Sequence, residues 1–155
     1  MPAPAPLRGP SAARPAEPGP ATDGPARARA GREPEVSLAL SVRQPWAALL
    51  ACGVKAVEVR TWPTARRGPV LIHAAKVPDD RPEGWARIVT PELKALAALR
   101  GGIVGVAELA ECVRYATPEG FAAAAERHLN APGWYRAGGL YGFVFQNARP
   151  IAYHA

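Results

Sequence analysis

The sequence has few cysteines, few aromatic residues and no long apolar segment. Its two cysteines, Cys52 and Cys112, lie far apart and form no CxxC pair, so we expect buried free thiols and no structural zinc. No apolar run approaches the roughly 20 residues that a membrane-spanning helix needs, and the N-terminus lacks the apolar block of a secretory signal. These absences predict a cytoplasmic protein with neither a membrane anchor nor a bound metal.

The common loops of nucleotide-binding enzymes and hydrolases are missing as well. The sequence contains no GxxxxGKS/T, GxGxxG, GxSxG or HExxH segment. This argues against the usual nucleotide-binding and protease classes, and no cofactor is expected. Aromatic residues make up 7% of the chain and hydrophobic residues 48%, so the core must come mainly from Val, Leu, Ile and four Trp.

Proline divides the chain into two parts near residue 35. Half of the 18 prolines precede that point, in a stretch whose only large aliphatic residue after Met1 is Leu7. Such a segment cannot bury enough apolar area to offset its ordering entropy. Residues 1–35 are therefore predicted to be a disordered Pro/Ala-rich tail, and 36–155 a single domain. The formal net charge of +6 permits attraction to phosphates, although a solvated basic surface explains it equally well.

Alternation of apolar and polar residues predicts a half-buried strand over 36–42. Pro45 suits the first turn of a helix that Gly53 ends. A second strand is expected over 55–62, with Val57 and Val59 on one face. A turn at 63–68 then leads to a third strand over 69–74, which is apolar enough to be buried on both faces.

Two Thr-Pro-Glu segments predict helix starts in the second half of the chain, at Thr90 and Thr117. The first of these helices ends at Gly101–Gly102, and the second runs to about Leu129. Long strands are expected over 103–113 and 140–151. Short connections favour antiparallel pairing, so the order of elements predicts an α+β, mostly β fold: a small mixed β-barrel with about three helices.

Polar residues gather where the first strand, the first helix and the second strand meet. Arg43 and Gln44 lie at the strand-to-helix junction, Lys55 begins the second strand, and Glu58 and Arg60 share one face of it. If this face turns inward, a carboxylate and a guanidinium meet in a partly dry pocket. Burying such charges is costly unless they are paired. A binding role and a plain Glu58–Arg60 salt bridge on a solvated edge strand therefore both stay open.

Five sequence blocks resemble, in their order along the chain, the ASCH family of the PUA-like superfamily: SVRQPWA, GxKxxExR with RTWPT, RGPVLIHAAK, GGIVGVAEL and GLYGFVFQNARPI. The resemblance covers about residues 36–151. It implies a small β-barrel with a cleft beside the motif helix that is proposed to bind RNA. One branch of the family is an amidohydrolase that deacetylates N4-acetylcytidine with a motif lysine as nucleophile, and another is reported as a ribonuclease.

The family motif falls on Gly53, Lys55, Glu58 and Arg60. Lys55 matches the nucleophile of the amidohydrolase branch, and a lysine becomes nucleophilic when desolvation or a nearby cation lowers its pKa. Glu58, however, stands where that branch has a threonine, and a carboxylate there tends to raise the pKa of Lys55. A carboxylate also suits recognition of a base, because it accepts from an exocyclic amine such as N4 of cytosine.

Further candidates lie close to this motif in the predicted fold. His73 and Lys76 follow the third strand, and His73 suits either general acid–base chemistry or a hydrogen bond at the barrel mouth. Trp62 could stack on a base or pack locally, whereas Trp46 is expected in the core.

Other features carry less weight. Arg66 and Arg67 suit either phosphate contacts or plain solvation. Trp134 suits a lid or a packed loop, and His128 is expected on the surface. Relatives usually continue after the Pro-Ile segment into another short strand, whereas this chain stops at Ala155, so an open barrel edge is expected.

The sequence thus predicts that one polar cleft binds RNA or a modified nucleoside through Arg43, Gln44, Lys55, Glu58, Arg60, Trp62, His73 and Lys76. The alternative is an amidohydrolase acting on an N4-acylated cytidine, with Lys55 and Glu58 as catalytic residues. Ribonuclease activity has less support, because no acidic cluster would hold a metal. A third hypothesis is a protein-interaction module that uses an open barrel edge, as a monomer or weak homodimer.

Overall fold

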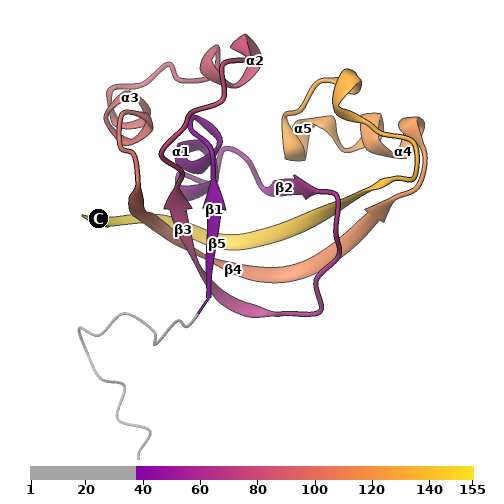
Figure 1. The fold of residues 1–155 in the computed structure, drawn as a ribbon, viewed down its shortest axis with the longest axis horizontal. Coiled ribbons are helices and arrows are strands. Elements are labelled where there is room, and N and C mark those ends of the chain that lie inside the picture. Colours follow the sequence, from indigo (N-terminus) through magenta and orange to yellow (C-terminus); the bar gives the residue numbers. More distant parts are fainter. Residues whose placement is uncertain (1–37) are drawn as a thin grey trace, which may run out of the picture. The chain divides into compact units, whose positions relative to one another are not determined.

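The computed structural model describes residues 38–155, and the tail predicted over 1–35 lies outside them. The described elements follow one another as β1 (Ala39–Val42), α1 (Trp46–Ala51), β2 (Val57–Arg60), β3 (Gly68–Ala74), α2 (Pro82–Trp85), α3 (Pro91–Ala97), β4 (Gly102–Tyr115), α4 (Pro118–Ala123), α5 (Ala125–His128), the 3-10 helix η1 (Pro132–Trp134) and β5 (Leu140–His154) (Figure 1). The predicted α+β class is confirmed, although the described part has more helices than the three expected.

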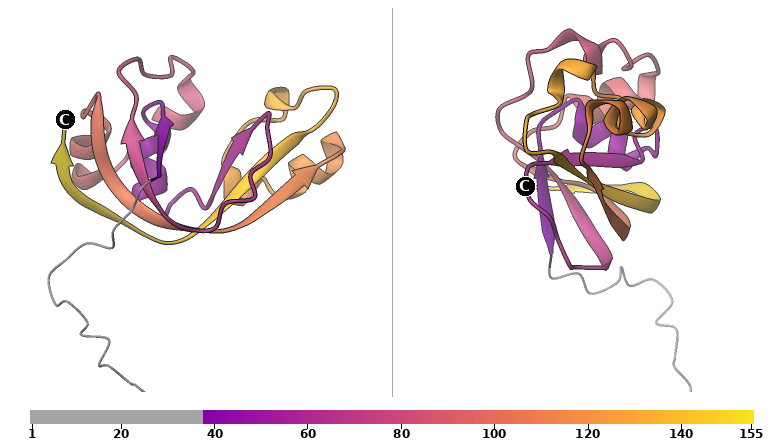
Figure 2. Two further views of the ribbon diagram at one scale, coloured as in Figure 1. Left: turned by 60° about the horizontal axis from the view of Figure 1, so that its bottom comes forward. Right: turned by 90° about the vertical axis from the view of Figure 1, so that its right-hand side faces the viewer.

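The strands form one sheet in the order β1-β3-β4-β5-β2. β1 runs parallel to β3, and the other neighbours are antiparallel. Register shifts interrupt the long β4–β5 ladder at three places, and irregularities of this kind bend paired strands. The β4–β5 pair curves into a trough (Figure 2). The predicted mixed barrel is therefore a half-barrel, with β1 and β2 as its two edges.

The helices lie above the concave face of this trough, with α1, α2 and α3 toward one end and α4 and α5 toward the other (Figures 1 and 2). α1 is buried along its whole length, because its sequence Trp-Ala-Ala-Leu-Leu-Ala carries no charged side chain. It packs against β3, β4 and β5. This close approach requires Gly105, since a Cβ there would lie 2.7 Å from the Cβ of Ala51. The chain on both sides of α1 is thereby held at one end of the trough.

The predicted helix starts are confirmed, but the first of the two helices ends at Ala97, before the expected Gly101–Gly102, and the second is divided. Thr90 and Thr117 cap α3 and α4 by accepting from backbone N–H groups, and Gly53 follows α1 with a φ of 72°. The helix expected up to Leu129 divides into α4 and α5 at Ala124, whose φ of −98° and ψ of 10° depart from helical values. The single turn α2 is too short to show an apolar period, so the sequence does not predict it.

β3 differs from its prediction. Its residues alternate between buried positions (Val70, Ile72 and Ala74) and half-buried or exposed ones (Pro69, Leu71 and His73). The expectation that β3 is buried on both faces is therefore wrong. The reason is the half-barrel itself, because the helices cover only the concave face of the sheet (Figure 2).

Candidate functional site

A side chain joins the two edges of the sheet. Nη2 of Arg60 in β2 donates to the backbone carbonyl of Ser41 in β1 over 2.9 Å. A hollow of about 360 Å³ opens beside this contact, which is within the size range of small-ligand pockets. Its lining comes from five separate segments and consists of Ser41, Val42, Arg43, Trp46, Glu58, Val59, Arg60, Ala75, Asp79, Arg81 and Trp134.

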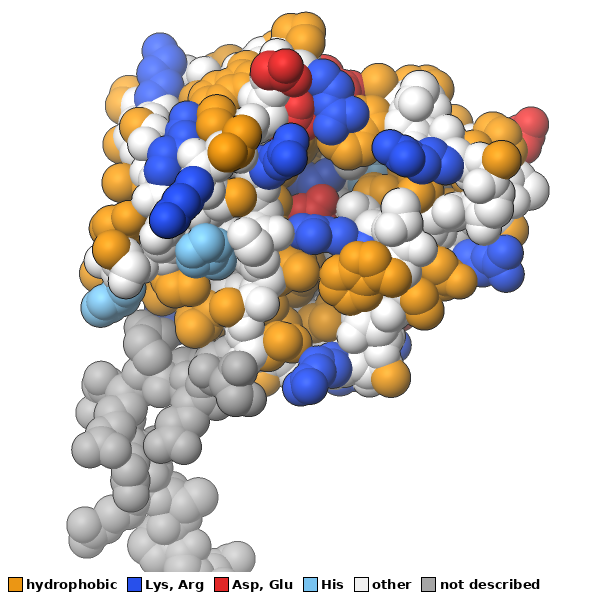
Figure 3. Space-filling view, in the orientation of Figure 1, with side chains coloured by type: hydrophobic (Ala, Val, Ile, Leu, Met, Phe, Trp, Pro, Cys, Tyr) orange, Lys and Arg blue, Asp and Glu red, His pale blue; other side chains and the backbone are white. Residues whose placement is uncertain are grey.

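The hollow is rich in charged groups. Three guanidinium groups line it, those of Arg43, Arg60 and Arg81, together with the carboxylates of Glu58 and Asp79. The space-filling view shows a recessed acidic side chain framed by basic ones on this face (Figure 3). The excess of cations over anions favours a ligand that carries negative charge, such as a phosphate.

The negative charge of Asp79 is compensated by its neighbours. Its buried carboxylate accepts from Nε1 of Trp46 at 2.8 Å and from Nε and Nη2 of Arg81, both at 3.0 Å. Burial by itself raises the pKa of Asp79, but the hydrogen bonds from Arg81 and Trp46 outweigh it and lower the pKa to about 2. Asp79 therefore stabilises the wall of the hollow, and its charge is already compensated.

Two tryptophans form an aromatic wall of the hollow. Trp46 and Trp134 pack edge to face, with ring centroids 5.9 Å apart. The guanidinium carbon of Arg81 lies 3.4 Å from the ring centroid of Trp134. Glu83 fixes the same segment, because its carboxylate accepts from the Trp134 indole at 2.5 Å and from the N–H of Ala131 at 2.9 Å. The wall is thus organised by contacts within the domain.

Glu58 has a different environment from Asp79. Its side chain is nearly buried, and Oε1 accepts from the N–H of Val59 at 3.1 Å. Oε2 lies 3.8 Å from Nη2 of Arg60, which is an ion pair but too long for a hydrogen bond. Among residues 38–155, no group donates a hydrogen bond to this oxygen. Glu58 therefore contributes an acceptor that the fold leaves unsatisfied.

Lys55 is almost fully buried, with 1% of its surface exposed. Its Nζ donates to the backbone carbonyl of His128 and to Oδ1 of Asn130, and it lies 4.7 Å from the ring centroid of Trp46. Burial lowers the pKa of Lys55 to about 8, although Glu58 opposes this shift. The side chain does not line the hollow. It ties the segment after α5 to the start of β2.

The prediction that His128 lies on the surface is wrong. The ring is fully buried and stacks on Phe121, with centroids 4.1 Å apart. Nδ1 accepts from the N–H of Asn130 at 3.0 Å, so Nε2 is the donor to the carbonyl of Phe121 at 2.7 Å. Burial lowers the pKa of His128 and favours its neutral form. Leu129 follows with a φ of 63°, which marks a sharp turn of the chain after the ring. The sequence does not reveal this burial, because charged residues directly precede His128.

Gln44 has a structural role and stabilises the fold. Its side chain is fully buried, and its amide nitrogen donates to the carbonyls of Leu96 at 2.9 Å and Leu99 at 3.1 Å. Its Oε1 accepts from the N–H of Ala48 at 3.0 Å. The amide therefore connects the start of α1 to the end of α3 and does not line the hollow.

The remaining predicted site residues lie around the hollow. Nδ1 of His73 is 3.1 Å from Oγ of Ser41, and Lys76 is exposed beyond the end of β3. Trp62 lines a second, apolar pocket. Of the eight residues predicted, the hollow is lined by Arg43, Glu58 and Arg60 and not by Gln44, Lys55, Trp62, His73 or Lys76.

Sequence reasoning missed Asp79, Arg81 and Glu83. They lie in and beside α2, in a segment that carries no recognisable motif. The one available signal was the run Asp79-Asp80-Arg81, which shortly precedes Trp85 in the chain. Only the fold shows that this run packs against Trp46 and Trp134.

The comparison with protein families agrees with this geometry. The family model for the ASCH domain matches residues 40–151. The chain belongs to the ASCH family. The resemblance predicted from the five sequence blocks is therefore confirmed. No curated protein matches the chain.

Solved structures share the fold of this ASCH domain. ASCH from Zymomonas mobilis is 13% identical, with a TM-score of 0.52, and the match covers 74% of this chain and 70% of that one. A point mutant of that protein gives a TM-score of 0.51 at 13% identity, over 75% of this chain and 73% of the other. At this identity the likeness shows the fold alone.

Membrane-spanning helices and metal-binding clusters are both absent from the part of the chain that the structure describes. None of the helices within residues 38–155 combines the length and apolar character needed to cross a membrane. In the same range, no three or more His, Cys, Asp or Glu residues come together in a way that could hold a metal ion.

Proposed function

We propose that this ASCH domain binds RNA or a modified nucleoside in the hollow beside the Arg60–Ser41 contact. The observation that carries the proposal is Oε2 of Glu58, a buried acceptor without a donor among residues 38–155. Leaving such a group unpaired costs free energy, so a ligand that donates a hydrogen bond to it gains affinity at that point.

A nucleotide matches the other groups of the hollow. Carboxylates accept from the exocyclic amine of cytosine, whereas uracil presents a carbonyl at the same position. Guanidinium groups bind phosphates through charge-assisted hydrogen bonds, and Arg43 and Arg60 both line the hollow. The proposal therefore favours bases with an exocyclic amine attached to a phosphate-bearing chain.

A binding screen tests this proposal. Thermal unfolding is measured with cytidine, N4-acetylcytidine, uridine, adenosine and short RNAs, since a ligand of the folded state raises Tm by mass action. Amine-bearing ligands are expected to raise Tm, and Glu58→Gln is expected to lose the effect. Glu119→Gln, which changes an exposed carboxylate of α4, is the matched control. A screen without any shift, or a shift unchanged in Glu58→Gln, would contradict the proposal.

Amidohydrolysis of an N4-acylated cytidine is the second candidate function. It is favoured by the pKa of Lys55, which burial lowers to about 8, because a neutral amine is the nucleophilic form. The amine would have to leave the carbonyl of His128 and the amide of Asn130 to attack a substrate. Incubation with N4-acetylcytidine and detection of cytidine test this candidate. Absent turnover, or turnover that persists in Lys55→Met, removes it.

A further inference from the structure

Trp62 differs from the other tryptophans of the domain. The indole N–H groups of Trp46, Trp85 and Trp134 all donate to Asp79 or Glu83 and hold the wall around α2. Trp62 lies beyond the end of β2 and is 47% exposed, although it packs edge to face on Phe143, with centroids 5.0 Å apart. Large exposed aromatic side chains of this kind are typical stacking platforms for unpaired bases.

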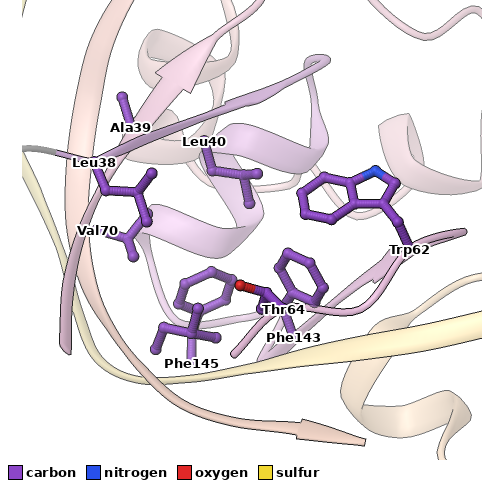
Figure 4. A pocket seen from close by; sticks show the side chains of 9 residues that line it. Leu38, Ala39, Leu40, Trp62, Thr64, Val70, Phe143 and Phe145 are labelled. Carbon is purple, nitrogen blue, oxygen red and sulfur yellow. The ribbon is translucent and has the colours of Figure 1, made fainter. Parts of the chain in front are cut away.

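The indole of Trp62 covers one side of a separate apolar pocket of about 110 Å³. Figure 4 shows it pointing from its own segment toward Leu40 of β1 and the ring of Phe143. Val70 and Phe145 complete the apolar floor, and Thr64 contributes a hydroxyl at the side. An apolar surface beside an exposed indole suits the flat face of a base.

The apolar pocket and the polar hollow are lined by neighbouring residues on two segments of the chain. On β1, Leu40 lines the pocket and the next residue, Ser41, lines the hollow. On the other side, Trp62 lines the pocket and Arg60 lines the hollow. The guanidinium carbon of Arg60 lies 6.0 Å from the ring centroid of Trp62. Arg60 therefore stands between the two sites and can bind a group that passes from one to the other.

We propose that the two sites bind successive nucleotides of single-stranded RNA: the base of one enters the hollow, and the base of its neighbour stacks on Trp62. The phosphate between them then lies at Arg60, which uses one nitrogen for Ser41 and keeps further N–H groups for a ligand. Arg66 and Arg67 are exposed on the turn after Trp62 and add positive charge to the segment that follows it. This inference rests on the proposed function and makes its ligand an oligonucleotide, not a free nucleoside.

Calorimetric titration with two ligands tests the inference. Cytidine 5′-monophosphate carries a single base, which is expected to bind in the hollow beside Glu58, whereas the 5′-phosphorylated dinucleotide of cytidine can occupy both sites. One additional stacked base is expected to tighten binding by about tenfold or more. Trp62→Ala is expected to abolish that gain and leave the affinity for the mononucleotide unchanged. Trp62→Phe is expected to retain most of the gain.

Two controls separate stacking from a general loss of structure. Trp62→Leu keeps an apolar cover over the pocket without a stacking face, so it is expected to behave like Trp62→Ala. Tyr153→Ala removes another exposed aromatic side chain, one that lines neither site, and is expected to bind both ligands like the wild type.

Three results would overturn the inference. The first is equal affinity of the wild type for both ligands, and the second is an unchanged dinucleotide gain in Trp62→Ala and Trp62→Leu. Either of them leaves binding in the hollow intact. The third is absence of binding of both ligands to the wild type, which would also overturn the proposed function.

Discussion

Nη2 of Arg60, the last residue of β2, donates a hydrogen bond of 2.9 Å to the backbone carbonyl of Ser41 in β1. These strands are the two edges of the sheet, so this side chain connects elements that no strand pairing joins. The same guanidinium lies 3.8 Å from the unsatisfied oxygen of Glu58. Arg60 therefore makes a structural contact and also lines the hollow.

The first prediction concerns Arg60. Arg60→Ala is expected to lower the free energy of unfolding by about 1 kcal/mol, because it removes one hydrogen bond at the protein surface. The effect of Arg60→Ala on the affinity for RNA is expected to be larger than its effect on stability. If the guanidinium contacts one phosphate, the slope of log affinity against log salt becomes shallower by about 0.7. Fluorescence anisotropy with a labelled RNA at several salt concentrations measures this slope.

Arg87→Ala is the matched control, because Arg87 is exposed and does not line the hollow. It is expected to leave the slope unchanged. Equal effects of the two substitutions would mean that Arg60 acts only through the net charge of the domain.

The second prediction concerns the selectivity of Glu58. The wild type is expected to prefer ligands with cytosine over those with uracil, because Oε2 of Glu58 is an acceptor without a donor in the domain. Glu58→Gln can offer either an amide oxygen or an amide N–H, so the preference is expected to fall by about tenfold, within the range for one base contact. Competition titrations with paired cytosine and uracil ligands measure it. Retained selectivity in Glu58→Gln would show that another group reads the base.

The third prediction concerns the buried amine of Lys55. Lys55→Met leaves the carbonyl of His128 and Oδ1 of Asn130 without their donor, so we expect a loss of about 2 kcal/mol or more in unfolding free energy at neutral pH. Chemical denaturation of both proteins at one pH measures this difference. A fully stable Lys55→Met would mean that the contact with the segment after α5 contributes little.

The same pair of proteins also tests the pKa of Lys55. The folded-state pKa of about 8 lies below the ordinary lysine value of 10.5. Between these values the unfolded chain binds more protons than the folded one, so raising the pH stabilises the fold. The wild type is therefore expected to gain up to about 3 kcal/mol relative to Lys55→Met across this window. A constant difference between the two proteins would show that the pKa is unshifted.

The fourth prediction concerns the acid stability of the wall around Asp79. Its pKa is lowered from 3.8 to about 2, so its contribution is complete above pH 4 and is lost as the pH falls through about 2. The wild type is expected to lose up to about 2 kcal/mol of its advantage over Asp79→Asn in this range. Acid titration of denaturation midpoints for both proteins measures the loss. Parallel curves would contradict it.

Local signals in the sequence predicted much of the framework. The caps at Thr90 and Thr117 depend on contacts within one turn, so the sequence alone is sufficient to predict them. Likewise, alternation along the chain predicted that Glu58 and Arg60 share one environment. The positions of the other polar side chains depend on contacts with residues far away in the sequence. Gln44 and Lys55 stand beside the motif in the chain, but their polar atoms bond to α3 and to the segment after α5.

The wall around Asp79 is a second case in which distant contacts, and not local sequence, determine the site. Its residues carry no motif, so the sequence does not mark them as part of a site. They belong to the hollow only because Asp79 bonds to Trp46 of α1 and to Trp85 of α2. Burial of β3 was overestimated because an apolar composition does not tell whether one or both faces of a sheet are covered.

A titration of 15N-labelled protein with cytidine 5′-monophosphate, followed by NMR, tests most directly whether the hollow is the binding site. Binding there predicts shifts of the backbone amides of residues 41–43, 58–60 and 79–81 and of the indole N–H groups of Trp46 and Trp134, with little change in α4 and α5. Absence of shifts at millimolar ligand, or shifts centred on α4 and α5, would contradict this account.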